Sequence, residues 1–360
     1  MMETLFGWVL DLPAVWKIIL LIVMVVGGLF ALIKGADAFV DGACGIANRL
    51  KIPAIIIGLT IVSIGTSLPE TAVSVTAVTQ GSSEIAISNV VGSNIANILL
   101  VLGATFCISK VVCDKKMCLR DIFVMIASGM ILLAFALINI TGHGSVRISR
   151  IEALILLVLF IAYIVYVVIV ARKSMKQNTE SENAGNVQNQ ENGGTAEKVE
   201  EKQLPMWKII LLLVVGLLGV FLGGEFVVFG AQHFAVSVGM SETLVGLTIV
   251  AVGTSSPELV TSIVAAKKGS TGLALGNIIG SNIYNILFIL GLAGLVGPIS
   301  ISTNTIIDIC VMIGVMVLFS ILFFVYANKN KQMFRGVGIT FLAIYAVYLT
   351  YIILRDFVFV

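Results

Sequence analysis

Residues 65–70 read GTSLPE and residues 253–258 read GTSSPE, so nearly the same polar hexapeptide occurs twice in one chain of 360 residues. Each copy ends in a glutamate and lies within strongly apolar sequence. Burying an ionised carboxylate in apolar surroundings is costly unless a partner compensates its charge. The two hexapeptides are therefore the first candidates for a functional site.

The composition defines the environment of the chain. Hydrophobic residues make up 58% and charged residues 12%, and the mean hydropathy is +1.08, whereas roughly 25% of residues are charged in ordinary soluble domains. A net charge of +2 gives no reason to expect a nucleic-acid partner. The five cysteines form no CxxC pair, so we expect buried thiols. The chain is predicted to be an integral membrane protein.

The apolar segments predict the number of membrane spans. A helix needs about 20 apolar residues to cross a bilayer. Glycine and proline interrupt the second and the seventh candidates. Ten stretches qualify: 16–40, 52–78, 85–107, 120–140, 150–171, 206–230, 241–266, 272–296, 304–326 and 336–355. The expected fold class is an all-α integral membrane protein with ten transmembrane helices.

Loop charges predict the orientation. Lysine and arginine concentrate in the loops that follow odd-numbered spans, as in Arg49 and Lys51, and such loops are normally cytoplasmic. Both termini are then outside. Residues 172–205 are rich in Asn, Gln, Glu and Gly and predict a flexible cytoplasmic linker. The expected division is a first five-helix repeat over 1–171, this linker, and a second repeat over 206–360.

The chain also contains an internal duplication. Residues 58–103 align without a gap with residues 246–291, at an offset of 188. Each copy has five predicted spans, so the second starts on the opposite side of the membrane and the repeats are inverted. Inverted repeats with interrupted helices are typical of secondary transporters. Asp37 and Glu225 also occupy matching positions, either in a mobile helix pair or facing water near the end of a span.

Helical spacing gathers the polar residues of the duplicated segments. Because residues three and four apart share one helix face, each hexapeptide forms a line of oxygens. Pro69 and Pro257 lack an N–H and predict a kink that frees backbone carbonyls one turn before each glutamate. The residues on these faces are Ser63, Thr66, Ser67 and Glu70 in the second span and Thr254, Ser255 and Glu258 in the seventh, with Ala251 opposite Ser63.

The third and eighth spans add hydroxyl and amide groups at steps of four residues. These are Asn89, Ser93 and Asn97 in the third span and Asn277, Ser281 and Asn285 in the eighth. Carboxylate, carbonyl and hydroxyl oxygens without cysteine or histidine suit Ca²⁺ and Na⁺ and disfavour zinc, copper and iron. We therefore expect Glu70 and Glu258 to share a cation site near the midplane.

GTSLPE with VVGSNIAN, and GTSSPE with IIGSNIYN, resemble the two alpha-repeats of the sodium/calcium exchanger family in the cation/calcium antiporter superfamily, and its prokaryotic members in particular. The resemblance implies exchange of Na⁺ for Ca²⁺ by alternating access. It implies Glu70 and Glu258 as central ligands, with oxygens from Thr66, Ser67, Thr254, Ser255, Ser93, Asn97, Ser281 and Asn285, and backbone carbonyls of Ser63 and Ala251 at flanking sodium positions.

Two sequence features bear on the choice of ions. The GNxxE pattern around the acidic residue, which is the resemblance expected of the calcium/proton branch, is absent from this chain. Several exchangers, including potassium-dependent ones, carry Asp at the position of Asn285, so asparagine here argues against potassium co-transport. The alternatives are an antiporter of Ca²⁺ or another divalent cation with H⁺, and a cation channel.

The remaining expectations concern the setting of the protein. We expect a Ca²⁺-extruding, electrogenic antiporter that is not an enzyme, needs no cofactor and binds no nucleic acid. Its partners are the transported Ca²⁺ and Na⁺ and the lipid bilayer, and it functions as a monomer. The expected location is a bacterial inner membrane.

Overall fold

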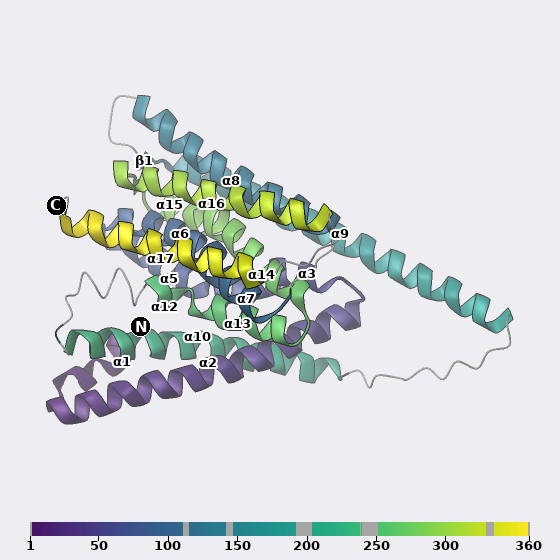
Figure 1. Ribbon diagram of the computed structural model, residues 1–360, viewed down its shortest axis with the longest axis horizontal. Coiled ribbons are helices and arrows are strands. Elements are labelled where there is room, and N and C mark those ends of the chain that lie inside the picture. Colours follow the sequence, from purple (N-terminus) through teal and green to yellow (C-terminus); the bar gives the residue numbers. More distant parts are fainter. Residues whose placement is uncertain are drawn as a thin grey trace.

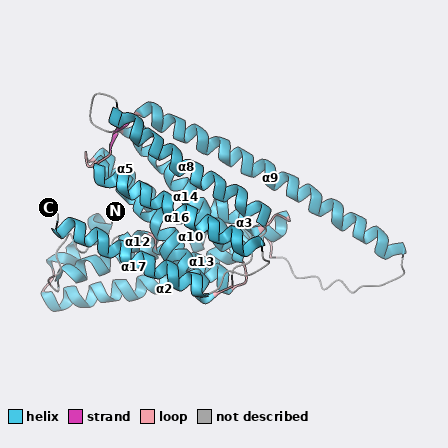
Figure 2. Cartoon of the chain, turned by 45° about the horizontal axis from the view of Figure 1, so that its top comes forward, coloured by secondary structure: helices cyan, strands magenta, loops and turns pink. Residues whose placement is uncertain are grey.

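The computed structural model describes residues 2–110, 115–141, 147–191, 204–237, 239, 251–328 and 335–358. The described chain is almost entirely helical, apart from one antiparallel pair of short strands (Figure 2). The elements are α1 (Met2–Phe6), η1 (Gly7–Asp11), α2 (Ala14–Leu50), α3 (Ala54–Ile57), η2 (Gly58–Val62), α4 (Ser63–Thr66), α5 (Leu68–Thr79), α6 (Ser83–Ala96), η3 (Asn97–Leu102), α7 (Gly103–Ile108), α8 (Lys115–Thr141), β1 (Arg147–Ile148), α9 (Arg150–Glu191), α10 (Met206–Ser237), α12 (Ala251–Thr254), α13 (Ser256–Lys267), α14 (Thr271–Tyr284), η5 (Asn285–Ile289), α15 (Leu290–Val296), β2 (Ile299–Ser300), α16 (Thr303–Asn328) and α17 (Arg335–Val358).

The apolar helices are long enough to cross a membrane. Within the described residues there are 8 such helices, or up to 9 when the bent pair Ala54–Thr66 and Leu68–Thr79 is taken as one span. The predicted seventh span, 241–266, begins outside the described residues, and only its part from Ala251 onward is seen. Large apolar side chains such as Phe123 and Ile151, each 73% exposed, cover the outer helices. A bilayer is the environment in which such a surface is stable.

The helices form a core and a separate pair. Helices α5, α6, α13 and α14 pack together in the core, and α8, α9, α16 and α17 flank them. Helices α2 and α10 lie side by side (Figure 1). Their backbones approach so closely that a Cβ on Gly35 would lie 2.5 Å from Val220 N, and one on Gly223 would lie 2.5 Å from Leu32 N. These glycines allow the two helices to pack as one unit.

The helices run between two faces of the molecule. The termini face carries α1, the β1–β2 pair and the end of α17, and the central-segment face carries the end of α9 and the start of α10 (Figure 1). Helix α2 begins on the termini face and ends on the central-segment face, and α10 runs the other way. The α2–α10 pair is therefore antiparallel.

The predicted helix breaks occur, together with π-helical turns that the spacing did not predict. The helix through Thr66 bends by 46° before Leu68, beside Pro69, as expected from the missing proline N–H. Turns η3 and η5 are π-helical and begin at Asn97 and Asn285. Such turns widen a helix locally and are frequent at functional sites.

Three other features differ from the sequence-based expectations. Helix α2 continues to Leu50 because small buried residues such as Ala43 and Ala47 extend its packed face, and Lys51 ends it at φ 54°. Helix α9 continues past the predicted boundary at 171 to Glu191, through a polar run in which Lys, Gln and Glu favour helix while Asn, Ser and Gly do not. The expectation of a thiol is wrong for Cys118, which is disulfide-bonded, because spacing alone gives no signal for such a bond. Cys44 and Cys107 are free but only half-buried, and Cys310 is free and exposed, so the expectation of burial is wrong for these three because apolar sequence in a membrane span can also face outward.

Candidate functional site

The two glutamates lie at the starts of two helices. Glu70 is in the first turn of α5 and Glu258 in the first turn of α13, and each is only 1% exposed. The positive end of a helix dipole stabilises a carboxylate placed there. The carboxylates are also close enough to interact electrostatically. The fold therefore brings the charged ends of both hexapeptides together in the interior.

Side chains from one sequence copy contact those of the other. Ser67 Oγ donates a hydrogen bond of 2.8 Å to Glu258 Oε1. Thr66 Oγ1 donates one of 3.1 Å to Asn277 Oδ1. All four of these side chains are buried. The site is therefore built at the contact between the two copies, and neither copy forms it alone.

Many oxygens in this site lack a hydrogen-bond partner. Buried acceptors are normally paired, because an unpaired one costs about 1–3 kcal/mol. A cation bound between the two carboxylates would provide these unpaired acceptors with a partner. The side-chain oxygens without a partner in the described part of the chain include Glu70 Oε2, Glu258 Oε2, Asn97 Oδ1, Asn285 Oδ1, Ser255 Oγ and Ser281 Oγ.

Two asparagine side chains connect the glutamate-bearing helices to their neighbouring helices. Asn89 Nδ2 donates to Ser74 Oγ at 3.0 Å, and Asn277 Nδ2 donates to Ser262 Oγ at the same distance. Asn89 Nδ2 also donates to the carbonyl of Glu70 at 3.3 Å. These bonds join α5 to α6 and α13 to α14. They hold the helices that carry the glutamates.

Asn94 and Asn282 are polar residues of the site region that the spacing argument missed. Asn94 Oδ1 accepts a hydrogen bond of 3.0 Å from Asn285 Nδ2, and Asn94 Nδ2 donates one of 3.3 Å to the carbonyl of Asn282. Both asparagines are fully buried. A signal was present in the sequence, because the Ser-Asn pair of the GSN motif occurs in both copies. The spacing of four residues that was used to find site residues includes the serine of this pair and leaves out the asparagine.

Nearly all the predicted site residues are buried in the structure. Those whose side chains are described are at most 8% exposed: Ser63, Thr66, Ser67, Glu70, Ser93, Asn97, Thr254, Ser255, Glu258, Ser281 and Asn285. Ala251 begins α12, and only its backbone is described. The carbonyl of Ser63 already accepts bonds from Ser67 N at 3.1 Å and Thr66 Oγ1 at 3.4 Å. Its role as a ligand stays a prediction.

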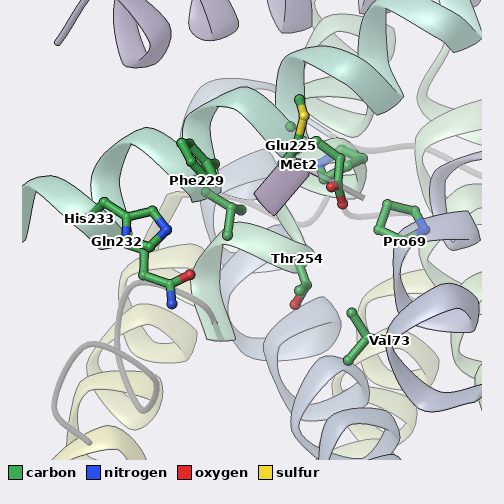
Figure 3. A pocket seen from close by; sticks show the side chains of 12 residues that line it. Met2, Pro69, Val73, Glu225, Phe229, Gln232, His233 and Thr254 are labelled. Carbon is green, nitrogen blue, oxygen red and sulfur yellow. The ribbon is translucent and has the colours of Figure 1, made fainter. Parts of the chain in front are cut away.

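Two cavities lead from the termini face toward the site. One of about 230 Å³ is lined by Glu225, Phe229 and Gln232 of α10, and by Thr254 and Pro257. Figure 3 shows Phe229, Gln232 and His233 on the left of this cavity, Pro69 and Val73 on the right, and Glu225 and Thr254 between them. The second cavity, of about 620 Å³, reaches Asn89, Ser93 and Thr254. Thr254 is thus in contact with both.

The chemistry of the site is that of hard oxygen donors. Carboxylate, amide and hydroxyl oxygens suit Ca²⁺ and Na⁺. Among the described residues no group of three or more His, Cys, Asp or Glu could hold a metal ion, so any cation held here would rely on two carboxylates and on neutral oxygens. The fold and the site together define a membrane protein with a buried cluster of hard oxygen donors around two carboxylates.

Comparison with known proteins identifies the family. The model of the sodium/calcium exchanger protein family matches residues 20–169 and 208–354. The chain therefore belongs to the sodium/calcium exchanger family. The sodium/calcium exchanger MaX1 of Methanosarcina acetivorans is 34% identical over 347 residues, which cover 89% of this chain and 95% of that protein. The putative antiporter CaxA of Alkalimonas amylolytica is 37% identical over 280 residues, 77% of this chain and 81% of that one.

Solved structures agree with this assignment. A structure of the sodium-calcium exchanger NCX_Mj matches with a TM-score of 0.73 at 33% identity, covering 92% of this chain and 98% of that chain. The likeness extends over nearly the full length of both proteins. The mostly helical membrane fold is therefore the fold of this family.

Proposed function

We propose that this protein is a secondary antiporter that exchanges Na⁺ for Ca²⁺ across a membrane by alternating access. The observation that carries the proposal is the set of unpaired buried oxygens around Glu70 and Glu258, at the contact between the two sequence copies. Membership in the sodium/calcium exchanger family supports the choice of ions. Two carboxylates match the charge of one Ca²⁺.

We further propose ten spans arranged as two inverted five-helix repeats, with residues 172–205 as a cytoplasmic linker. The 188-residue offset between the copies supports the repeats, and the loop lysines and arginines support an outward termini face. The protein works as a monomer in a bacterial inner membrane, without a cofactor or a catalytic reaction. In this orientation both cavities open to the outside.

The proposed ligands are the oxygens that converge on the two glutamates. Glu70 and Glu258 supply charge, and the neutral oxygens complete the coordination of Ca²⁺, which takes six to eight ligands. The neutral set consists of Thr66, Ser67, Thr254, Ser255, Ser93, Asn97, Ser281 and Asn285, with the carbonyls of Ser63 and Ala251 at flanking Na⁺ positions. Ca²⁺ and several Na⁺ compete for these atoms.

Competition for one pair of carboxylates couples the two fluxes. Moving the site across the membrane with uncompensated negative charge is costly, so the carrier changes state readily only when loaded. The α2–α10 pair is the element that slides, because its two helices pack closely on each other. With three or more Na⁺ per Ca²⁺ the cycle moves net charge, at about 2.3 kcal/mol per charge per 100 mV. An inward Na⁺ gradient then drives Ca²⁺ out.

Calcium flux in proteoliposomes tests the proposal. The purified protein is reconstituted, and ⁴⁵Ca²⁺ uptake is followed under imposed Na⁺, K⁺ or H⁺ gradients. We expect an outward Na⁺ gradient alone to drive uptake, and Glu70→Gln and Glu258→Gln to abolish it. Ser128→Ala, a buried serine in α8 that bonds the carbonyl of Met125, is the control and keeps full activity.

The other outcomes separate the alternatives. Uptake that follows a proton gradient and ignores Na⁺ would replace this function with Ca²⁺/H⁺ exchange. Flux that continues without any counter-ion gradient, down the Ca²⁺ gradient alone and without saturation, would indicate a channel. Normal transport by either glutamine variant would show that the ligand assignment is wrong.

A further inference from the structure

Lys268 connects the α2–α10 pair to the core. It lies in the turn between α13 and α14, and its Nζ is 2.7 Å from Asp41 Oδ1 and 3.4 Å from Asp37 Oδ1. The same Nζ donates to the carbonyl of Asp37 at 2.9 Å. Asp37 and Asp41 are one helical turn apart on α2. One ammonium group therefore bridges two carboxylates on the other side of the contact.

A second bond lies beside this ion pair. Cys44 Sγ of α2 donates to Ser270 Oγ at 3.4 Å. Both contacts involve the second half of α2, toward Leu50 and the central-segment face. Along this half, α2 is docked on the turn that joins α13 to α14.

Toward the termini face, a cavity separates part of α10 from the core helices. Glu225, Phe229 and Gln232 of α10 line the cavity of about 230 Å³ (Figure 3), and no hydrogen bond or ion pair of theirs to the described turn at residues 80–82 is found. These three residues correspond to Asp37, Asp41 and Cys44 of α2 at the offset of 188 residues. Equivalent residues of the two copies are thus docked at one face and open at the other.

The turn that corresponds to Lys268–Ser270 has the same backbone but lacks the charge. Residues Gln80–Ser82 follow α5, and Gly81 has a φ of 80° where Gly269 has 78°. Gln80 occupies the position of Lys268. When α10 docks on this turn in the opposite state, a neutral amide faces Glu225. An ion pair is therefore available at the central-segment face, and the described turn Gln80–Ser82 offers no cation for an equivalent pair at the termini face.

We propose that Lys268 is a positioning residue of the transport cycle, which holds α2 against the core through Asp37 and Asp41 and favours the state open to the termini face. This inference rests on the proposed alternating-access function. It predicts that the two docked forms are not equally stable, although the two copies share one architecture. If the termini face is outside, the ion-free carrier is mainly in the state whose site is accessible to external ions.

Two cysteine reporters test the proposal without measuring ion flux. Native Cys44 is half-buried and bonds to Ser270 where α2 is docked, and Gln232, also half-buried, lines the cavity where α10 is open. Each reporter is placed alone, with the other reactive cysteines replaced, in nanodiscs, and its rate of labelling by a soluble maleimide is measured. We expect Lys268→Gln to speed labelling of Cys44 and to slow labelling at Gln232→Cys, each by about two- to fivefold, which is the range for an exposed ion pair.

The paired reporters separate a change of state from local damage. If Lys268→Gln only loosens its own turn, Cys44 reacts faster while Gln232→Cys on the opposite face is unchanged, and the proposal is wrong. Lys268→Arg keeps the charge and restores both rates. Thermal unfolding of each variant shows that the protein is folded.

The reciprocal variant gives an independent test. Gln80→Lys places a cation opposite Glu225 in the other docked state, so it should also slow labelling at Gln232→Cys. The added change Glu225→Gln removes the new partner and should cancel this effect. An effect that persists without Glu225, or no effect at all, overturns the proposal. If the flux assay instead assigns another counter-ion, these labelling results are unaffected, so the two failures are distinguishable.

Discussion

Ser67 Oγ donates a 2.8 Å hydrogen bond to Glu258 Oε1, so a hydroxyl of one sequence copy holds the carboxylate of the other. The reciprocal pair differs, because neither Ser255 Oγ nor Glu70 Oε2 has a hydrogen-bond partner among the described residues. The hexapeptides are nearly identical, yet their glutamates are held differently. The site is asymmetric at the level of single bonds.

Removing the Ser67 hydroxyl should therefore weaken ion binding through Glu258. A hydrogen bond to a charged group contributes about 1.5–3 kcal/mol, so Ser67→Ala should raise the apparent KM for Ca²⁺ about tenfold or more. The maximal rate should change less, because both carboxylates remain. Saturation curves of Ca²⁺ uptake give both values, with Ser128→Ala as the buried control. An unchanged KM would remove Ser67 from the site.

Neutralising a glutamate should stabilise the ion-free protein while it abolishes transport. Glu70 and Glu258 are buried and repel each other when both are ionised, and functional sites commonly carry such a cost. We expect Glu70→Gln and Glu258→Gln to raise the Tm in chelator and to lose the further rise that Ca²⁺ gives the native protein. Thermal unfolding with and without Ca²⁺ measures both effects. A Tm that falls in chelator would contradict this account.

Asn285→Asp should be costly because of a particular contact. Asn285 Nδ2 donates to Asn94 Oδ1 at 3.0 Å, and aspartate would place an acceptor against that acceptor. The expected loss is about 1–3 kcal/mol in cation-free buffer, partly recovered by Ca²⁺ or K⁺.

Asn97→Asp, at the matching position of the first copy, is the control for this prediction. Asn282 Oδ1, the counterpart of Asn94 Oδ1, has no hydrogen-bond partner among the described residues. The variant at Asn97 therefore breaks no such bond. Chemical or thermal unfolding of the two variants should show the larger loss for Asn285→Asp, and equal losses would contradict the argument.

The features that were predictable from the sequence are local ones. Hydropathy places a span wherever a long apolar run occurs, and Pro69 bends its helix because it lacks an N–H, whatever the neighbouring helices do. The glutamates were identifiable because charge is rare in such segments. The pairing of the two hexapeptides followed from their repetition.

The features that were not predictable depend on contacts between distant residues. The bond from Asn285 to Asn94 joins different copies, and the contact of Lys268 with Asp41 joins a turn to a helix more than two hundred residues earlier. The π-helical turns at Asn97 and Asn285 are also set by packing of the surrounding helices. Helical periodicity carries no information on any of these.

The glycines between α2 and α10 give a prediction about packing. A Cβ on Gly35 would lie 2.5 Å from Val220 N, so Gly35→Ala must push the helices apart. Overpacking of this kind costs about 1–3 kcal/mol, and we expect a lower Tm and slower exchange. Gly27→Ala is the matched control on the same helix, since its Cβ meets nothing within 4 Å, and alanine favours helix there by up to about 1 kcal/mol. Equal behaviour of the two variants in unfolding and flux assays would contradict close packing of the pair.

The larger cavity gives a prediction about ion entry. Its lining includes Glu84, Asp308 and Arg355, and Arg355 Nη1 lies 3.0 Å from Asp308 Oδ1. Arg355→Gln leaves Asp308 uncompensated, which should attract cations to the cavity and lower the apparent KM for Ca²⁺ about two- to threefold at low ionic strength. Salt screens such an effect, so the difference should disappear as an inert salt is added.

Arg355→Lys is the control because it keeps the charge, and it should leave the KM near the native value. Asp308→Asn removes the carboxylate and leaves Arg355, so it should raise the KM instead. Initial rates of Ca²⁺ uptake at several ionic strengths measure all three variants. A KM that moves in the same direction for Arg355→Gln and Asp308→Asn, or that is insensitive to salt, would show that the ion pair acts through packing of α16 and α17 and not through its charge.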